Sequence, residues 1–151
     1  MTRPEPARSR EQRKRDVLDR LEKDKDAWVS TASADGVPTL VPLWFVWDGE
    51  ALLMATRRTN PTASNVTSNG RAQIALGHTR DVVMIEATAE VVEGSDFPMA
   101  PGDAFAKKFD WDLRGRSAWV CLRFTPYAVR AWRESNEQPG RDLMTDGRWL
   151  V

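Results

Sequence analysis

The dipeptides Asp35-Gly36 and Asp48-Gly49 constrain the fold of this chain more than any other sequence feature. Asp-Gly favours the tight turns that join antiparallel strands, and each dipeptide here separates two short apolar runs. The run after the first dipeptide contains Pro42, which lacks the N–H that a strand ladder needs and should therefore lie at an edge or a bulge. By the same criteria we expect strands at residues 27–33, 38–47, 51–56, 72–77, 82–92, 117–124 and 129–132.

Short helices are expected beside these strands, at residues 10–26, 60–70 and 101–114. In the first helix, Val17, Leu18 and Leu21 form one narrow apolar stripe, which should pack over the end of a barrel. Asn60 and Pro61 are residue types that begin a helix. Six or so antiparallel strands with small helices at their ends predict a mainly β (α+β) fold, a closed or partly split antiparallel β-barrel with short flanking helices.

The length of 151 residues, 41% of them hydrophobic, fits one domain with a proper core. Three regions are expected: a disordered N-terminal tail (residues 1–9), the barrel domain with its N-terminal helix (10–132), and a C-terminal extension without clear periodicity (133–151).

Charge and composition exclude several classes of function. Lys plus Arg and Asp plus Glu both total 22, and this balance argues against a general nucleic-acid binder. Cys121 is the sole cysteine and His78 the sole histidine, so an internal disulfide and a zinc site built from several cysteines or histidines are excluded. Because no secretory segment opens the chain and no apolar run approaches a membrane span, we expect a cytoplasmic protein without membrane contact.

The segment from Thr56 to Asn65 is the candidate binding site. It directly follows an apolar run, so a strand brings hydroxyls, amides and two guanidinium groups to one sheet edge just before a helix begins. Hydroxyl and backbone donors at a helix N-terminus stabilise an anion, and arginine adds forked, charged hydrogen bonds. The segment therefore predicts a phosphate site, although Arg57 and Arg58 could also form an ordinary solvated turn. No residue of the chain is an obvious nucleophile.

The order of the motifs is informative beyond each motif alone. A helix comes first, and the hairpin Asp35-Gly36-Val37-Pro38 and the run from Val41 to Gly49 follow it. The Thr56 segment with Asn65 comes next, and the strand from Arg71 to Leu76 comes last. This order, over about Val17 to Phe124, resembles the pyridoxamine 5′-phosphate oxidase-like family of split β-barrels that bind FMN or the deazaflavin coenzyme F420.

The resemblance implies a homodimer with the coenzyme between the two subunits. On that basis the residues expected to face its phosphate are Thr56, Arg57, Arg58 and Thr59, and those expected along its isoalloxazine are Leu40, Val41, Pro42 and Leu43. Family members often carry a lysine or arginine three residues before the asparagine that matches Asn65, and here that position is Thr62. A hydroxyl donates one hydrogen bond but supplies no charge, so Arg57 or Arg58 compensates or phosphate affinity is reduced.

The leading hypothesis is an oxidoreductase that uses F420 or FMN to pass a hydride to a small conjugated or aromatic acceptor. The chemistry would belong to the coenzyme, which accounts for the shortage of catalytic side chains. Two alternatives stay open, a flavin or deazaflavin carrier or sensor without catalysis, and a degenerate barrel that acts as a dimeric interaction module without a cofactor. Trp111, Trp132 and Trp149 could stack on a ring system or fill an interface, and Trp44 could pack in the core or in a dimer interface.

Overall fold

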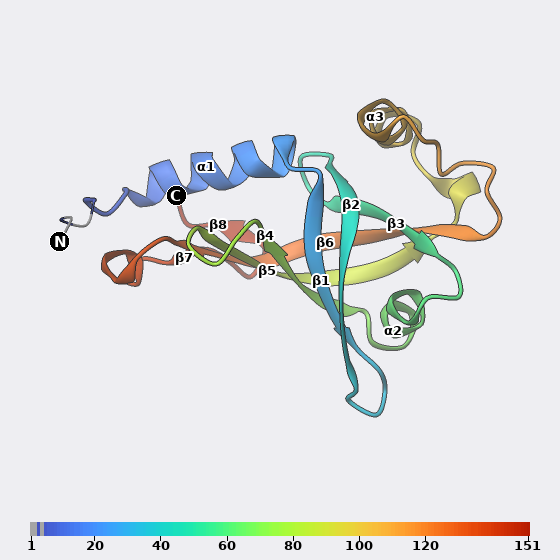
Figure 1. Cartoon of the computed structure of the whole chain (residues 1–151), viewed down its shortest axis with the longest axis horizontal. Coiled ribbons are helices and arrows are strands. Elements are labelled where there is room, and N and C mark those ends of the chain that lie inside the picture. Colours follow the sequence, from blue (N-terminus) through green and yellow to red (C-terminus); the bar gives the residue numbers. More distant parts are fainter. Residues whose placement is uncertain (1–2, 4) are drawn as a thin grey trace.

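The structure, a computed structural model, describes residue 3 and residues 5–151 and shows a closed antiparallel barrel (Figure 1). The sheet has the order β3-β2-β1-β4-β5-β6-β7-β8, and an additional pairing of β3 with β6 closes the first six strands into a ring. The strands are β1 Asp26–Ala32, β2 Pro38–Trp47, β3 Leu52–Arg57, β4 Arg71–Leu76, β5 Val82–Val92, β6 Trp119–Trp132, β7 Asp142–Thr145 and β8 Arg148–Trp149. The expected six-stranded antiparallel barrel with flanking helices is confirmed.

The helices lie in two separate parts of the molecule. They are α1 Arg10–Lys23, α2 Pro61–Asn69 and α3 Met99–Phe109, with the short 3-10 helices η1 Gly94–Asp96 and η2 Ser135–Glu137. Helix α1 lies in the half that contains β7 and β8, whereas α2 and α3 lie in the other half (Figure 1). Val17 and Leu21 of α1 are buried in the main core, as their spacing predicts.

The apolar side chains form two cores because residues along a strand alternate between its two faces. Phe45, Leu52 and Met54 point into the barrel, where they meet buried residues of every other barrel strand. Their neighbours Val46 and Leu53 point outward and pack with Phe105 of α3 in a second cluster. Helix α3 therefore covers part of the outer barrel surface, over β2, β3 and β6.

Strand β6 is continuous from Trp119 to Trp132, so the expected division into strands at 117–124 and 129–132 is wrong. Pro126 does not interrupt pairing, because the register between β5 and β6 shifts at this point: Ala87 is opposite Pro126 and Glu86 is opposite Ala128. Such a bulge accommodates an extra residue, here Tyr127, and tolerates a proline that cannot donate.

Helix α3 covers Met99–Phe109 instead of residues 101–114. It ends early because Asp110 adopts a left-handed conformation with φ of 51°.

The C-terminal extension, expected to lack a pattern, forms the β7–β8 hairpin around Asp146 and Gly147, which both have positive φ. This hairpin continues the sheet because β7 pairs with β6.

The segment before α1, expected to be disordered, makes defined contacts in its described part. The guanidinium of Arg8 hydrogen-bonds to both carboxylate oxygens of Glu137, at 2.8 and 2.9 Å, and forms an ion pair with Asp16 at 2.8 Å. The carbonyl of Glu5 accepts a hydrogen bond from the side chain of Asn136. The expectation of disorder for residues 1, 2 and 4 concerns positions outside the described residues.

Candidate functional site

The barrel is split between β2 and β3. These strands pair only from Phe45 to Trp47, and the β1–β2 hairpin then extends away from β3 (Figure 1). The backbone N–H of Phe45 points toward β1, where it donates to the carbonyl of Lys25. Backbone groups of successive residues in a strand point alternately to its two sides, so those of Pro42 and Trp44 point away from β1 and toward the split. Pro42 brings no N–H there. The expectation that it lies at an edge is confirmed for this part of the strand.

A cavity of about 330 Å³ lies at this split. Its walls are largely apolar and aromatic, and they come from β2, from β3, from the loop after α3 and from the start of β6. Trp111 and Trp119 meet edge to face with their ring centroids 4.8 Å apart, and Trp44 stacks on Phe109 at 4.7 Å. The residues lining the cavity are Pro42, Leu43, Trp44, Ala55, Trp111 and Trp119.

Arg57 lies against Trp119, one of the residues that line this cavity. It is opposite Trp119 in the β3–β6 ladder, and its guanidinium carbon lies 5.1 Å from the centroid of the indole ring. A cation over an indole face is attracted by the ring quadrupole. Arg57 makes no ion pair with any residue that the structure describes, so its charge is available to a ligand.

Arg58 is engaged elsewhere. Its guanidinium forms a fork with the carboxylate of Glu93, with both nitrogen–oxygen distances at 2.7 Å. It also donates to the backbone carbonyl of Ser117. The hydrogen bond from Arg58 lowers the pKa of Glu93, so the carboxylate stays charged to a lower pH than an isolated glutamate. The two neighbouring arginines therefore have different roles, one beside the cavity and one within an ion pair.

The start of α2 has free donor capacity beside β3. Asn60 is the N-cap residue, but its side-chain amide donates to the hydroxyl of Thr56 at 3.0 Å and does not cap the helix. Pro61 has no N–H, and the backbone N–H of Thr62 donates to no group that the structure describes. A helix start with an unpaired N–H attracts anions.

The remaining expected site residues are divided between the inside and the outside of the barrel. Leu40 and Pro42 are exposed on the outer surface, whereas Val41 and Leu43 pack against the main core. Thr56 and Thr62 are buried, and Thr59 is exposed.

Asn65 is buried and has structural hydrogen bonds. Its side-chain amide donates to the hydroxyls of Thr31 at 3.1 Å and Thr39 at 3.4 Å, so it joins α2 to the β1–β2 hairpin. The structure therefore brings Thr56, Arg57 and the start of α2 together, while the side chains of Arg58 and Asn65 are occupied by other partners.

Sequence reasoning did not include Trp119 or Glu93 among the site residues. Both contact the arginine pair across strands that are distant in the chain, and no local pattern carries that information. Cys121, expected to be a buried inert thiol, is fully buried, and burial raises its pKa to about 12. It does not provide a nucleophile at neutral pH.

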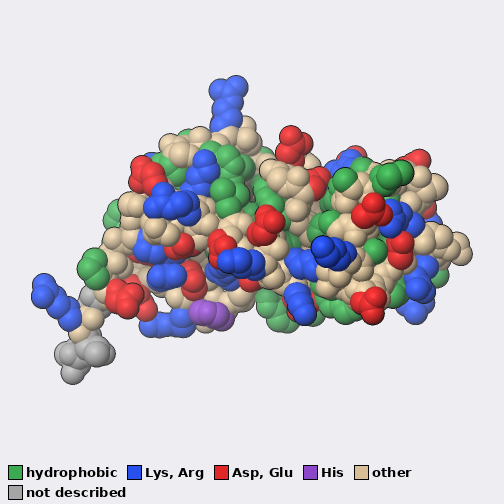
Figure 2. Space-filling view, turned by 90° about the horizontal axis from the view of Figure 1, so that it is seen from above, with side chains coloured by type: hydrophobic (Ala, Val, Ile, Leu, Met, Phe, Trp, Pro, Cys, Tyr) green, Lys and Arg blue, Asp and Glu red, His purple; other side chains and the backbone are tan. Residues whose placement is uncertain are grey.

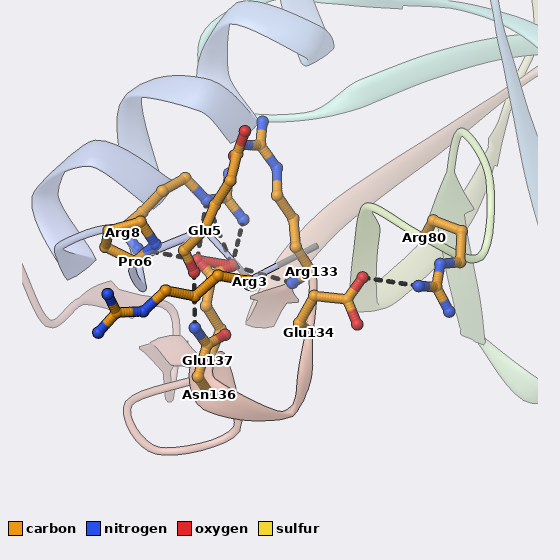
Figure 3. Close-up of a pocket in the computed structure, with 9 residues that line it drawn as sticks. All are labelled: Arg3, Glu5, Pro6, Arg8, Arg80, Arg133, Glu134, Asn136 and Glu137. Carbon is orange, nitrogen blue, oxygen red and sulfur yellow. Dashed lines mark hydrogen bonds and ion pairs between the residues drawn. The ribbon is translucent and has the colours of Figure 1, made fainter. Parts of the chain in front are cut away.

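Another cavity, of about 420 Å³, lies at the other end of the molecule (Figure 3). Several of its charged side chains are paired with each other: Arg8 points at Glu137, and Arg80 binds Glu134 at 2.7 Å. This network joins the N-terminal segment to the region around η2. We therefore assign it a structural role and place the candidate site at the split.

No group of potential metal ligands occurs among the described residues. None of the described helices combines the length and the apolar character that crossing a membrane requires. On the face seen in Figure 2, acidic and basic side chains are intermixed, without a large patch of one sign.

A closed six-stranded barrel with an aromatic cavity at the β2–β3 split defines a split-barrel protein. The model of the pyridoxamine 5′-phosphate oxidase family matches residues 14–133, and the chain belongs to this family. The resemblance expected from the order of the motifs is thereby confirmed. No curated protein matches the chain in sequence at a significant level.

Solved structures of several other proteins share the fold. An F420 reductase is 19% identical, over 72% of this chain and 91% of that chain, with a TM-score of 0.58. General stress protein 26 from Bacillus anthracis is 19% identical, over 78% and 92%, with a TM-score of 0.60. The heme storage protein HutZ from Vibrio cholerae is 14% identical, over 89% and 97%, with a TM-score of 0.65. At these identities the likeness concerns the fold.

Proposed function

We propose that this protein is an oxidoreductase that binds F420 or FMN at the β2–β3 split and passes a hydride to a small conjugated or aromatic acceptor. One observation carries the proposal: an aromatic cavity lies at the split, and the unpaired guanidinium of Arg57 lies against one of its walls, at Trp119. A flat apolar surface beside a cation suits a planar ring with a phosphate on its side chain. The fold shared with an F420 reductase supports the same reading.

The residues present fit such a coenzyme. Trp111 and Trp119 would contact its ring system, and Arg57 with the N–H of Thr62 would hold its phosphate. The split also leaves backbone groups of β2 without strand partners beside Trp44. These groups would orient the polar edge of the ring, because buried backbone donors and acceptors require partners.

When bound, the coenzyme supplies the hydride chemistry. The protein binds the ring, orients it toward the acceptor and excludes water from the cavity. None of the described residues that line the cavity ionises near neutral pH. We therefore expect no steep change in turnover between about pH 6 and 9 that arises from a cavity side chain.

We further propose a homodimer. Apolar side chains lie exposed on one outer surface that runs from β2 across β1 and β4 to β5, where the strand registers place Trp28 beside Pro42 and Ala75, and Ala75 beside Met84. Trp28 is 45% and Leu40 63% exposed. Large contiguous apolar surfaces of this kind mark protein interfaces, and a two-fold contact is the simplest closed form. This surface adjoins the cavity through Pro42 and Trp44, so a partner subunit would cover the coenzyme.

Heme binding is a second candidate because HutZ, with the same fold, is a heme storage protein. The described residues that line the cavity contain no histidine, cysteine, methionine or tyrosine, the usual axial ligands of heme iron. His78 lies exposed in the turn between β4 and β5. The donor set therefore favours a flavin or deazaflavin. The cytoplasmic location expected from the sequence stays a prediction.

Absorption spectra of the purified protein, recorded during separate titrations with FMN and F420, test the proposal. A saturable change with one coenzyme per subunit supports binding. Anaerobic mixing of the reduced complex with conjugated acceptors then separates an enzyme from a carrier or sensor, because only an enzyme reoxidises the coenzyme faster than free solution does. A protein that binds neither coenzyme is a degenerate barrel, and the proposal fails.

A further inference from the structure

Arg116 presents a guanidinium group beside the aromatic residues of the split. It lies in the loop between α3 and β6, where two tight turns hold its backbone: its N–H donates to the carbonyl of Leu113 at 3.2 Å, and its carbonyl accepts from the N–H of Trp119 at 3.0 Å. Its Nε donates to the carbonyl of Asp112 at 2.7 Å, and its guanidinium carbon lies 4.9 Å from the ring centroid of Trp111. Backbone groups and an indole ring therefore set the position of this guanidinium.

The two terminal nitrogens of Arg116 are available to a ligand. Neither of them takes part in a hydrogen bond or an ion pair within the part of the chain that the structure describes. Arg114, two residues earlier, is instead paired with Asp103 and Asp112, each at 2.9 Å. Two nitrogens of a guanidinium match the two oxygens of a carboxylate and form parallel, charged hydrogen bonds with them. Arg116 is therefore suited to bind a carboxylate.

A cavity of about 320 Å³, here called the side cavity, lies beside Arg116. Trp119 lines both the side cavity and the cavity at the split, so the two adjoin at this residue. The charged residues that line the side cavity are Arg58, Glu93 and Arg116. Arg58 and Glu93 neutralise each other in their fork, which leaves the charge of Arg116 without a counterion. The side cavity thus favours a ligand with a negative charge.

We propose that the hydride acceptor of this protein is a conjugated or aromatic carboxylic acid, whose carboxylate is held by Arg116 in the side cavity. The conjugated part of such an acid extends along Trp119 toward the split, where the coenzyme ring is proposed to lie. The hydroxyls of Ser95 and Ser117 also line the side cavity and donate to no group that the structure describes. They can therefore donate to the same carboxylate.

The inference rests on the proposed function and deepens it, since it names the chemical class of the acceptor and the residue that selects it. A hydride, with its two electrons, passes from the reduced F420 or FMN to the conjugated part of the acid, and a proton from water completes the reduction. The carboxylate keeps all its bonds and serves only for binding. The two unpaired arginines then have separate ligands: Arg57, on Trp119, takes the coenzyme phosphate, and Arg116, on Trp111, takes the carboxylate.

The test compares two planar probes of nearly the same shape, trans-cinnamate and the neutral cinnamamide. Their dissociation constants are measured by NMR titration of the whole protein without coenzyme, at low and at high salt. The wild type should bind cinnamate about fivefold more tightly than cinnamamide at low salt, because only the carboxylate forms a charged pair with Arg116. The preference should shrink at high salt, since exposed charges are screened.

Four variants identify the residue responsible for this preference. Arg116→Gln should abolish it and change the affinity for cinnamamide by less than about twofold, whereas Arg116→Lys keeps the charge without the fork and should retain part of it. Arg57→Gln should weaken coenzyme binding and leave the preference for cinnamate. Arg148→Gln is the matched control, because Arg148 is exposed in β8 and makes no ion pair with a described residue; it should change neither affinity. Circular dichroism confirms that each variant is folded.

The outcomes separate this inference from the proposed function. Equal affinities of the wild type for the two probes, or no detectable binding of cinnamate, would overturn the role of Arg116 and leave the proposed function standing. A preference that survives in Arg116→Gln, or that Arg57→Gln or Arg148→Gln abolishes equally, would do the same. If Arg116 selects cinnamate but neither FMN nor F420 binds, the carboxylate site stands, whereas the proposed function and the role of the acid as acceptor fail.

Discussion

The guanidinium of Arg57 lies 5.1 Å from the ring centroid of Trp119, its partner across the β3–β6 ladder. The adjacent Arg58 turns instead to Glu93 and Ser117. This difference arises because consecutive residues at the end of a strand point to opposite sides. We therefore expect Arg57 and Arg58 to contribute unequally to ligand binding, although both carry a guanidinium.

Arg57→Ala should therefore weaken coenzyme binding more than Arg58→Ala. A charged hydrogen bond is worth about 1.5 to 3 kcal/mol, so the loss of Arg57 should raise the dissociation constant roughly tenfold or more. The loss of Arg58, already neutralised, should change it by less than about threefold. Fluorescence titration with F420 measures both. Equal effects of the two variants would show that the contact with Trp119 does not mark the binding arginine.

Asn65→Ala should destabilise the protein without a direct effect on the phosphate. The variant leaves the hydroxyls of Thr31 and Thr39 without their shared donor, at a cost of about 1 to 3 kcal/mol in the free energy of unfolding. Urea denaturation measures this value. Asn69→Ala, at the exposed end of α2, is the matched control and should change stability by less than about 0.5 kcal/mol. An unchanged urea midpoint for Asn65→Ala would contradict the structural role.

Leu40→Glu should produce monomers. Leu40 is exposed in the single chain, so a carboxylate there leaves the monomer fold intact but would be buried without a partner in the proposed interface. Light scattering at micromolar concentration measures the mass. Met99→Glu, on the exposed surface of α3, is the control and should remain dimeric. A wild-type protein that is monomeric in this measurement rules out the interface.

Glu137 should contribute stability that disappears in acid. Burial opposes its ionisation, but hydrogen bonds from Arg8 and from the backbone of Arg133 outweigh burial and lower its pKa to about 2. Because the folded pKa lies below the unfolded value of about 4.3, the contribution is fully present above that value and is lost as the pH falls toward 2. It is on the order of 3 kcal/mol.

Urea denaturation between pH 2 and 6 tests this dependence. Glu137→Gln should be less stable than the wild type at pH 6, and the difference should narrow toward pH 2. Glu134→Gln, which removes an exposed carboxylate near Glu137, should follow the wild-type curve closely. A constant difference between Glu137→Gln and the wild type at all pH values would show that ionisation of Glu137 is not involved.

Most of the fold could be predicted from local signals, and the limits of those signals have physical causes. The turns at Asp35-Gly36 and Asp48-Gly49 define the first three strands. Asp146-Gly147 also joins two strands, although its flanking runs are too short to show a period. The continuity of β6 was not predictable, because it depends on a bulge at Tyr127 of β6, where the register with β5 shifts beside Pro126.

The candidate site was predictable only in part. The segment from Thr56 to Thr62 follows a strand and starts a helix, and both features are local. The partners of Arg57 and Arg58 are Trp119 and Glu93, which meet them only because β3 pairs with β6 and β6 with β5. A sequence pattern within one strand cannot distinguish the arginine that is free from the arginine that is paired.

The central claim is that the β2–β3 split holds the coenzyme, and a crystal structure of the protein grown with F420 tests it most directly. We expect the deazaflavin ring in the cavity formed by Pro42, Trp111 and Trp119, with the phosphate within hydrogen-bonding distance of Arg57. A coenzyme found elsewhere, such as in the charged cavity beside Arg8 and Glu137, would contradict the account.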